Sequence, residues 1–239
     1  MHPSNLEPRL LPYLAAGGVL PLLVAASTAA FSLSGWDEGA SAHRRLVANA
    51  MATEEPVIVY FQTDWCGWCR RLNQEYLADG TVVRQLRRVR KVAINPEQGA
   101  DEKALFRQYG GKGFPSFFVY VPAFDSRPKK LSPFRGSGAS PPAQFAREID
   151  QAIAQEYNTK GYAHSQRDQD RRAIAYYQKA LEYDAENAYA CHALAASYQR
   201  LATSNHYGRL LSNAKEYYRR TLEVDPDHEA SKHALAVLQ

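Results

Sequence analysis

The stretch Val57-Ile58-Val59-Tyr60-Phe61-Gln62-Thr63-Asp64-Trp65-Cys66-Gly67-Trp68-Cys69 decides how this chain folds. Its first five residues are all β-branched or aromatic, and this continuous apolar run predicts a strand buried on both faces. A polar turn follows, and the two cysteines then stand where a helix begins. We expect that helix to continue from Arg70 through Leu77.

Further strands and helices alternate around this stretch. We expect helices near 40–51, at 101–109 and from 141 to about 157, and strands at 89–94, 116–121 and, more weakly, 130–134. This order predicts an α/β layer rather than a helical bundle.

The placement of the two cysteines predicts redox chemistry. At the start of a helix, Cys66 meets unpaired backbone N–H groups and the helix dipole, which favour a thiolate over a thiol. Cys69, one turn further in, is close enough to attack a mixed disulfide formed at Cys66. Cys66 is therefore the expected attacking thiol and Cys69 the resolving one. We expect Arg70 and Arg71 to favour the thiolate, while Asp64 either caps the helix, the interpretation we prefer, or opposes the negative charge.

Two motifs resemble the thioredoxin superfamily over roughly residues 40–156. The segment from Thr63 to Leu72 resembles the active-site segment of that family, including the tryptophan before the first cysteine. Gly113-Phe114-Pro115-Ser116 resembles the segment in which a cis-proline faces the dithiol. The resemblance implies a thioredoxin-like α/β fold, with a central mixed sheet flanked by helices, and a cis Phe114–Pro115 bond. It also implies a substrate-binding surface made by four residues: Trp65, Trp68, Phe114 and Pro115.

The sequence departs from thioredoxins at two points. Thioredoxins commonly carry a buried acidic residue six positions before the first cysteine, where this chain has Tyr60. Gly67-Trp68 replaces the Gly-Pro pair between the cysteines, and looks more like envelope and single-domain thioredoxin-like proteins. A redox-inert thioredoxin fold used for binding is the alternative interpretation.

The C-terminal part repeats itself. Residues 173–182 are echoed by residues 214–223, and a repeat of this kind predicts stacked helix pairs. Leu194 to Tyr198, and the pairs Ala173 with Tyr177 and Ala214 with Tyr218, resemble the core of tetratricopeptide repeats. The resemblance implies a degenerate first repeat starting at Lys160-Gly161, extra residues around 202–213 and a terminal helix at 229–239. Cys191 is expected to pack between helices as a small apolar residue.

The N-terminal segment favours export. Residues 10–31 carry no charge, and small residues crowd positions 25–30, as a signal-peptidase site requires. The run is also long enough to cross a bilayer as a helix. A cleaved signal peptide and a retained membrane anchor are therefore both open, with a buried helix of a soluble protein as the third alternative. We expect the protein to be periplasmic, or membrane-anchored and facing the extracytoplasmic side.

The composition argues against proteins that bind nucleic acids, metals or cofactors. The 239 residues carry a net charge of +4, and the densest basic run, at 84–91, is interleaved with Leu86 and Val89. We interpret that run as a helix end leading into a strand, and we expect no nucleic-acid binding. Three cysteines without a second Cys or His pair at ligand spacing predict no metal site, and we expect no cofactor.

These observations predict three parts: a leader or anchor with a linker at 1–36, a thioredoxin-like domain at 37–156 that folds on its own, and an all-α tetratricopeptide-like module at 157–239. The expected function is a thiol–disulfide oxidoreductase of the cell envelope, acting through Cys66 and Cys69. Its partners would be protein thiols or disulfides, a redox partner protein, and a peptide or protein docked on the helical tail. The alternative is a non-catalytic binding scaffold that uses both surfaces.

Overall fold

The computed structural model describes residues 33–123, 127–135, 138–205 and 208–238. The expected signal peptide or anchor at 10–31 lies outside these residues. The elements follow the chain in this order: β1 (Asp37–Glu38), α1 (Gly39–Thr53), β2 (Val57–Phe61), α2 (Gly67–Arg71), the π-helical turn η1 (Leu72–Tyr76), α3 (Gly80–Leu86), β3 (Arg90–Ile94), α4 (Ala100–Gln108), β4 (Ser116–Tyr120), β5 (Lys129–Leu131), β6 (Phe134–Arg135), β7 (Gly138–Ala139), α5 (Pro142–Ser165), α6 (Asp170–Tyr183), α7 (Ala188–Asn205), α8 (Gly208–Val224) and α9 (Glu229–Val237).

The central sheet is mixed, as the resemblance implied. Its strand order is β1-β3-β2-β4-β5, and β6 pairs with β7 in a separate two-stranded sheet. β3 runs parallel to β1 and β2, whereas β4 runs antiparallel to β2 and β5. The strand predicted at 57–61 is β2, in the middle of the sheet, and the strands predicted at 89–94 and 116–121 are β3 and β4.

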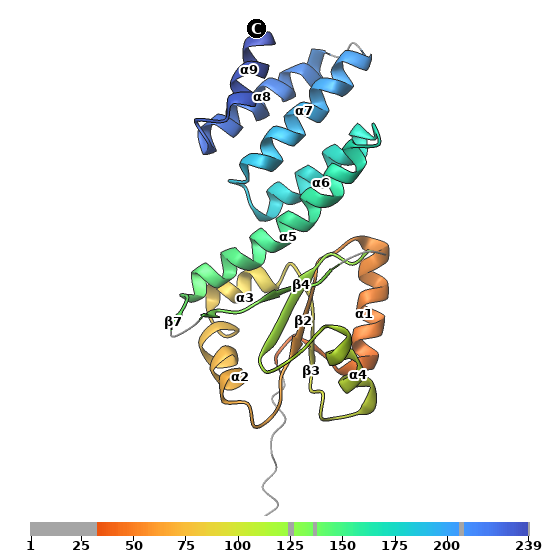
Figure 1. The fold of residues 1–239 in the computed structure, drawn as a ribbon, viewed down its shortest axis with the longest axis vertical. Coiled ribbons are helices and arrows are strands. Elements are labelled where there is room, and N and C mark those ends of the chain that lie inside the picture. The colour runs from red at the N-terminus through yellow and green to blue at the C-terminus, as the bar shows by residue number, and fades with distance from the viewer. Residues whose placement is uncertain (1–32, 124–126, 136–137, 206–207, 239) are drawn as a thin grey trace, which may run out of the picture. The chain divides into compact units, whose positions relative to one another are not determined.

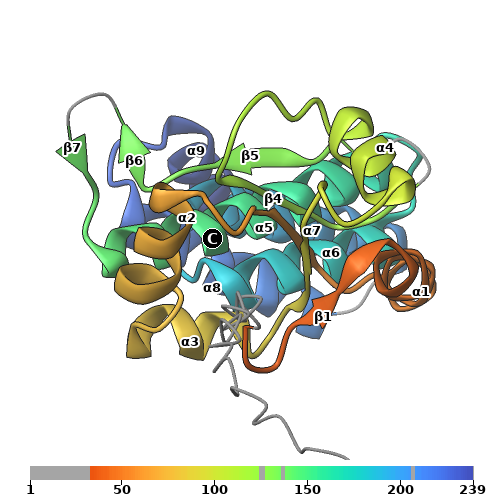
Figure 2. The same ribbon diagram turned by 90° about the horizontal axis from the view of Figure 1, so that it is seen from below.

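Helices cover both faces of this sheet (Figures 1 and 2). Ile58 and Tyr60 of β2 belong to a core shared with α2, α3 and α5, and Val57, Val59 and Phe61 belong to a second core shared with α1 and α4. Alternate residues of a strand point to opposite faces, so a strand covered on both sides has to be apolar throughout. This is why the continuous run at 57–61 identifies the centre of the fold.

The helix α5 is longer than the sequence predicted. It continues past Tyr157 to Ser165, so the boundary expected between residues 156 and 157 lies inside one helix. Its first half packs on the sheet through Phe145, Ile149 and Ile153, and its second half packs against α6. Because the helix is continuous, the sheet and the helical tail share one structural element.

Glu54 links the end of α1 to this region. The Tyr157 hydroxyl donates to the Glu54 carbonyl oxygen at 2.8 Å, the Tyr176 hydroxyl donates to the Glu54 carboxylate, and Lys179 lies 3.5 Å from the same carboxylate. Tyr176 and Lys179 belong to α6, so α6 as well as α5 contacts the α/β layer.

The helical tail has the core that the repeat pattern predicted. In the chain, α6 packs against α7, α7 against α8 and α8 against α9. The aromatic members of the two repeated pairs, Tyr177 and Tyr218, are buried with their alanine partners and with Leu194. Of the residues expected to be extra, 202–205 lie at the end of α7 and 208–213 at the start of α8. Cys191 is fully buried in α7, and burial raises the pKa of its thiol.

Gly161 allows α5 and α6 to approach closely, and this gives a testable prediction. A Cβ atom at Gly161 would lie 2.6 Å from the Tyr177 ring, closer than any real contact. Gly161→Ala should lower the free energy of unfolding by about 1–3 kcal/mol, because overpacking outweighs the better helix propensity of alanine. Urea denaturation of the full chain measures this.

Gly80→Ala is the matched control. Its Cβ would meet only the flexible end of Arg84, at 3.9 Å. This variant should keep or slightly raise the stability. If Gly161→Ala were as stable as Gly80→Ala, the close packing of α5 on α6 would be wrong.

Candidate functional site

The strand β2 is followed by a short turn and then by the two cysteines. Gln62 and Thr63 continue the buried path of the strand, and the Gln62 N–H donates to the Ile94 carbonyl of β3 at 3.0 Å. The backbone then turns, and the Cys66 N–H donates to the Thr63 carbonyl at 3.2 Å. α2 begins at the next residue, so the sheet fixes where the helix starts.

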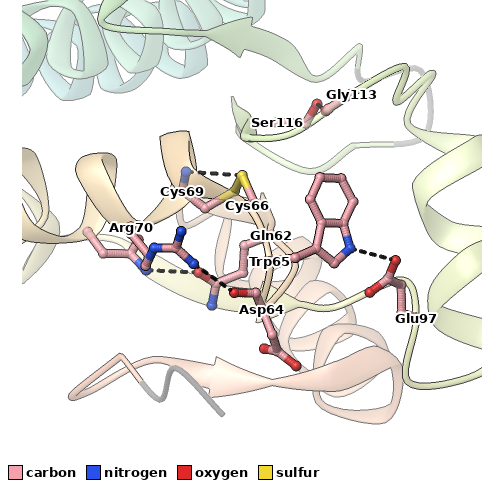
Figure 3. The surroundings of a disulfide bond; sticks show 10 residues. Gln62, Asp64, Trp65, Cys66, Cys69, Arg70, Glu97, Gly113 and Ser116 are labelled. Carbon is pink, nitrogen blue, oxygen red and sulfur yellow. Dashed lines mark hydrogen bonds between the residues drawn. A yellow bond between two sulfur atoms is a disulfide. The ribbon is translucent and has the colours of Figure 1, made fainter. Parts of the chain in front are cut away.

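Cys66 and Cys69 are joined in a disulfide, with their Cα atoms 5.2 Å apart (Figure 3). Both are buried, Cys66 being 4 % and Cys69 1 % exposed. Cys66 is the N-cap of α2, and its Sγ accepts the backbone N–H of Cys69 at 3.0 Å. A hydrogen bond from a helix N-terminus favours a negative charge on the acceptor, so this position stabilises Cys66 as a thiolate once the disulfide is reduced.

The expectation that Asp64 caps this helix is wrong. The cap is Cys66, whose backbone is extended (φ −72°, ψ 103°) and whose own sulfur accepts the first-turn N–H group. Asp64 lies two residues earlier, in the turn, and Figure 3 shows its carboxylate directed away from the sulfur atoms.

Neither Arg70 nor Arg71 forms a hydrogen bond with the sulfur atoms of the pair. Arg70 donates to the Asp64 carbonyl oxygen at 3.2 Å, which ties α2 to the turn before it. Arg71 pairs with Glu75 at 2.8 Å. Both guanidinium groups are thus hydrogen-bonded to other partners, and the Cys66 sulfur accepts its hydrogen bond from the backbone of α2.

The two tryptophans of the motif are exposed. Trp65 is 65 % and Trp68 55 % exposed, unusual for side chains of this size. The Trp65 indole N–H donates to a Glu97 carboxylate oxygen at 2.9 Å (Figure 3). The Trp65 ring packs edge-on against Phe114, with 6.0 Å between the ring centres. An ordered, exposed aromatic ring beside a reactive pair is a typical contact surface for another protein.

A groove of about 400 Å³ lies beside the disulfide and contains three of the four expected substrate-binding residues. Its lining is contributed by α2, the segment before β4, and the β5–β7 region: Trp68, Arg71, Phe114, Pro115, Ser132, Phe134, Gly138 and Ala139. The Phe114–Pro115 peptide bond is cis, as the resemblance implied. Trp65, the fourth expected residue, adjoins the groove through its contact with Phe114.

Sequence reasoning missed two parts of this site. Phe134 of β6 forms a wall of the groove, with its ring 5.1 Å from Trp68 and 5.5 Å from Tyr76. Behind the disulfide, Asn73 donates to Gln62 at 2.9 Å, a buried polar pair that joins η1 to the turn. Both depend on contacts between distant residues, and no local pattern in the sequence signals them.

Tyr60 occupies the position where thioredoxins commonly carry an acid. It is fully buried on the same face of the sheet as the disulfide, packed edge-on against Trp36, and burial raises the pKa of its phenol well above the ordinary value. The hydroxyl has no hydrogen-bond partner among the described residues. Tyr60 is therefore neutral, and it supplies no carboxylate beneath Cys69.

Comparisons with known proteins agree with this geometry. A thioredoxin-like domain model matches residues 45–153, and a tetratricopeptide-repeat model matches residues 154–187. Residues 45–153 are thus a thioredoxin-like domain, carrying a Cys-x-x-Cys pair at disulfide distance, and a tetratricopeptide repeat follows it. The search of curated proteins gave no match.

Several solved structures are similar to the chain. A thioredoxin from Thermus thermophilus is 26 % identical, covers 48 % of this chain and 85 % of its own, and has a TM-score of 0.39. The reduced C-terminal domain of DsbD from Neisseria meningitidis is 23 % identical, covers 47 % of this chain and 95 % of its own, and has a TM-score of 0.38. A DsbH oxidoreductase is 18 % identical, covers 49 % of this chain and 83 % of its own, and has a TM-score of 0.39.

The residues that the structure describes contain no cluster of His, Cys, Asp and Glu able to hold a metal ion. Within those residues, no helix combines the length and the apolar character needed to cross a bilayer.

The unpaired Tyr60 hydroxyl predicts an unusual effect of mutation. Removing a buried polar group that has no partner removes a desolvation penalty, so Tyr60→Phe should raise the free energy of unfolding by up to about 1 kcal/mol. Tyr157→Phe is the control, because the Tyr157 hydroxyl donates to the Glu54 carbonyl. That variant should be less stable by about 1 kcal/mol. Urea denaturation compares both, and a clear loss of stability in Tyr60→Phe would mean that its hydroxyl has a partner.

Proposed function

We propose that this protein is a thiol–disulfide oxidoreductase that exchanges disulfides with other proteins through Cys66 and Cys69. The observation that carries the proposal is the position of Cys66 at the start of α2 in a thioredoxin-like domain, with its sulfur hydrogen-bonded to the helix backbone and linked to Cys69. Such a pair supplies a stabilised nucleophile and a resolving thiol within one turn of helix.

The exchange needs both cysteines in order. In the reducing direction, the Cys66 thiolate attacks one sulfur of a substrate disulfide, forms a mixed disulfide and releases the other substrate sulfur as a thiolate. Cys69 then loses its proton and attacks the Cys66 sulfur, which forms the Cys66–Cys69 disulfide and releases the second substrate thiolate. Two electrons pass to the substrate, whose two thiolates take up protons. The same steps run backwards oxidise a substrate dithiol, and a partner dithiol or disulfide restores the starting state.

The surface beside Cys66 fits an extended protein segment. The four residues expected to bind substrate, Trp65, Trp68, Phe114 and Pro115, lie around or next to the groove at the disulfide. We assign them to substrate binding because aromatic rings and a backbone edge give contact area without demanding one sequence.

The proposal also includes a location in the cell envelope and the docking of a partner on the helical tail. The uncharged segment 10–31 supports export, with the protein released or anchored on the extracytoplasmic side. The tetratricopeptide match supports docking of a peptide or protein partner on the tail.

Trapping of partners tests the chemistry. Cys69→Ser should still attack substrates but fail to resolve the product, so mixed disulfides through Cys66 should accumulate and be released by dithiothreitol. Cys66→Ser should abolish both attack and trapping, because the nucleophile is missing. Non-reducing electrophoresis and mass spectrometry of purified full-length variants, incubated with a disulfide-containing protein such as insulin, measure both outcomes.

Cys191→Ser is the control. Its thiol is fully buried in α7, away from the pair, so turnover and trapping should match the wild type. If Cys66→Ser trapped partners and Cys69→Ser did not, the two roles would be reversed. If neither variant formed a trap and the wild type never turned over, the protein would be a binding scaffold.

The proposed location has a separate test. A reporter that is active only outside the cytoplasm, fused after Trp36, should be active because residues 10–31 direct export. The same fusion with charged residues inserted into that segment should be inactive. If a reporter that works only in the cytoplasm were active when fused at the same point, the proposed location would be wrong, and the proposed redox chemistry would be unaffected.

A further inference from the structure

The groove beside the disulfide has one charged residue among the described residues that line it. Trp68, Phe114, Pro115 and Phe134 give it aromatic and apolar walls, and Arg71 contributes the charge. Trp68 stands between the two cysteines in sequence, so the groove adjoins the redox pair. Any protein segment that places a sulfur at Cys66 and continues along this groove passes Arg71.

Neighbouring groups hold Arg71 in place. Its guanidinium carbon lies 5.5 Å from the centre of the Phe134 ring and 5.6 Å from the centre of the Trp68 ring, within the range of cation–π attraction. Its Nε donates to a Glu75 carboxylate oxygen at 2.8 Å. The side chain is thus ordered before a substrate arrives, which lowers the entropy lost on binding.

Arg71 nevertheless has donors to spare. A guanidinium carries five N–H groups, and Glu75 takes the one on Nε. The terminal amino groups have no hydrogen-bond partner among the described residues. Both members of the pair are about half exposed, 43 % and 52 %, so water screens the attraction and Glu75 neutralises Arg71 only weakly. A second carboxylate is able to bind the free edge.

We propose that Arg71 makes this protein favour substrates with an aspartate or glutamate about two residues from the cysteine that reacts with Cys66. Arg71 lies five positions after Cys66, a helical rise of roughly 7.5 Å, and two residues of an extended segment cover roughly 6.6 Å. The aromatic walls then accept an apolar side chain of the same segment. This inference rests on the proposed oxidoreductase function and adds the charge of the substrate to it.

Arg70 provides a matched control in the same helix. It carries the same charge one residue earlier, but it donates to the Asp64 carbonyl and does not line the groove. An effect of net charge alone would appear equally in Arg70 and Arg71 variants. An effect of the groove would appear in Arg71 variants alone.

The test uses short peptides, each with one cysteine, oxidised to their symmetric disulfides. Each peptide carries Asp, Asn or Lys two residues from the cysteine. One set of three peptides has this residue before the cysteine, and a second set has it after the cysteine. The full-length protein is reduced with dithiothreitol, separated from it and mixed with each peptide at low salt. Chromatography follows the peptide thiols released as the Cys66–Cys69 disulfide forms.

The wild type should react roughly fivefold to tenfold faster with the best Asp peptide than with its Asn counterpart, and more slowly with Lys. Arg71→Gln should bring the Asp-to-Asn ratio of rates close to one, and Arg71→Glu should invert it. Arg71→Lys should keep a preference for Asp, and Arg70→Gln should keep the wild-type ratio. The preference should also fade at high ionic strength.

Two negative results have different meanings. If the wild type reacts with all peptides at equal rates, or if Arg71→Gln and Arg70→Gln change the ratio equally, the role of Arg71 is wrong while the oxidoreductase function stands. If no peptide disulfide reacts with the reduced wild type, the proposed function itself fails.

Discussion

The hydrogen bond from the Cys69 backbone N–H to the Cys66 sulfur is the interaction on which the site depends. It exists because the turn after β2 places Cys66 directly before α2, so that Cys66 is the helix cap instead of a residue within the helix. A thiolate at this position receives the favourable end of the helix dipole without any charged side chain. The buried Gln62–Asn73 pair and the Arg70 bond to Asp64 fasten the turn on either side.

The remainder of the fold holds this junction in place. β2 is covered on both faces, and α5 crosses the sheet before continuing into the helical tail. Contacts from α6 to Glu54 extend that continuity to the end of α1. A sheet packed on both faces holds the site in one geometry. This suits thiol–disulfide exchange, in which the Cys66 sulfur moves little as it changes its bond from one sulfur atom to another. The aromatic groove with Arg71 adjoins the redox pair, where we propose that substrates bind.

Much of this arrangement could be predicted from the sequence, where the signal is local. The run at 57–61, the Cys-x-x-Cys spacing and the repeated Ala–aromatic pairs each report a short-range periodicity, and they located β2, the redox pair and the cores of the tail. The cap was missed because backbone conformation, not residue preference, selects Cys66 over Asp64. Phe134, Asn73 and the unpaired Tyr60 hydroxyl depend on contacts across the fold, which the order of residues does not encode locally. The length of α5 was missed because the composition changes near residue 157 although the helix does not end there.

The central claim is that Cys66 and Cys69 form a reversible redox pair, and an equilibrium titration tests it most directly. The full-length protein would be equilibrated in buffers of defined dithiol-to-disulfide ratio and followed by tryptophan fluorescence, because Trp65 and Trp68 directly precede the two cysteines in the chain. The account predicts one reversible two-electron transition, with a slope of about 30 mV per tenfold change in the ratio of oxidised to reduced protein. A pair that stays oxidised or reduced across the whole range accessible to biological thiols would contradict it.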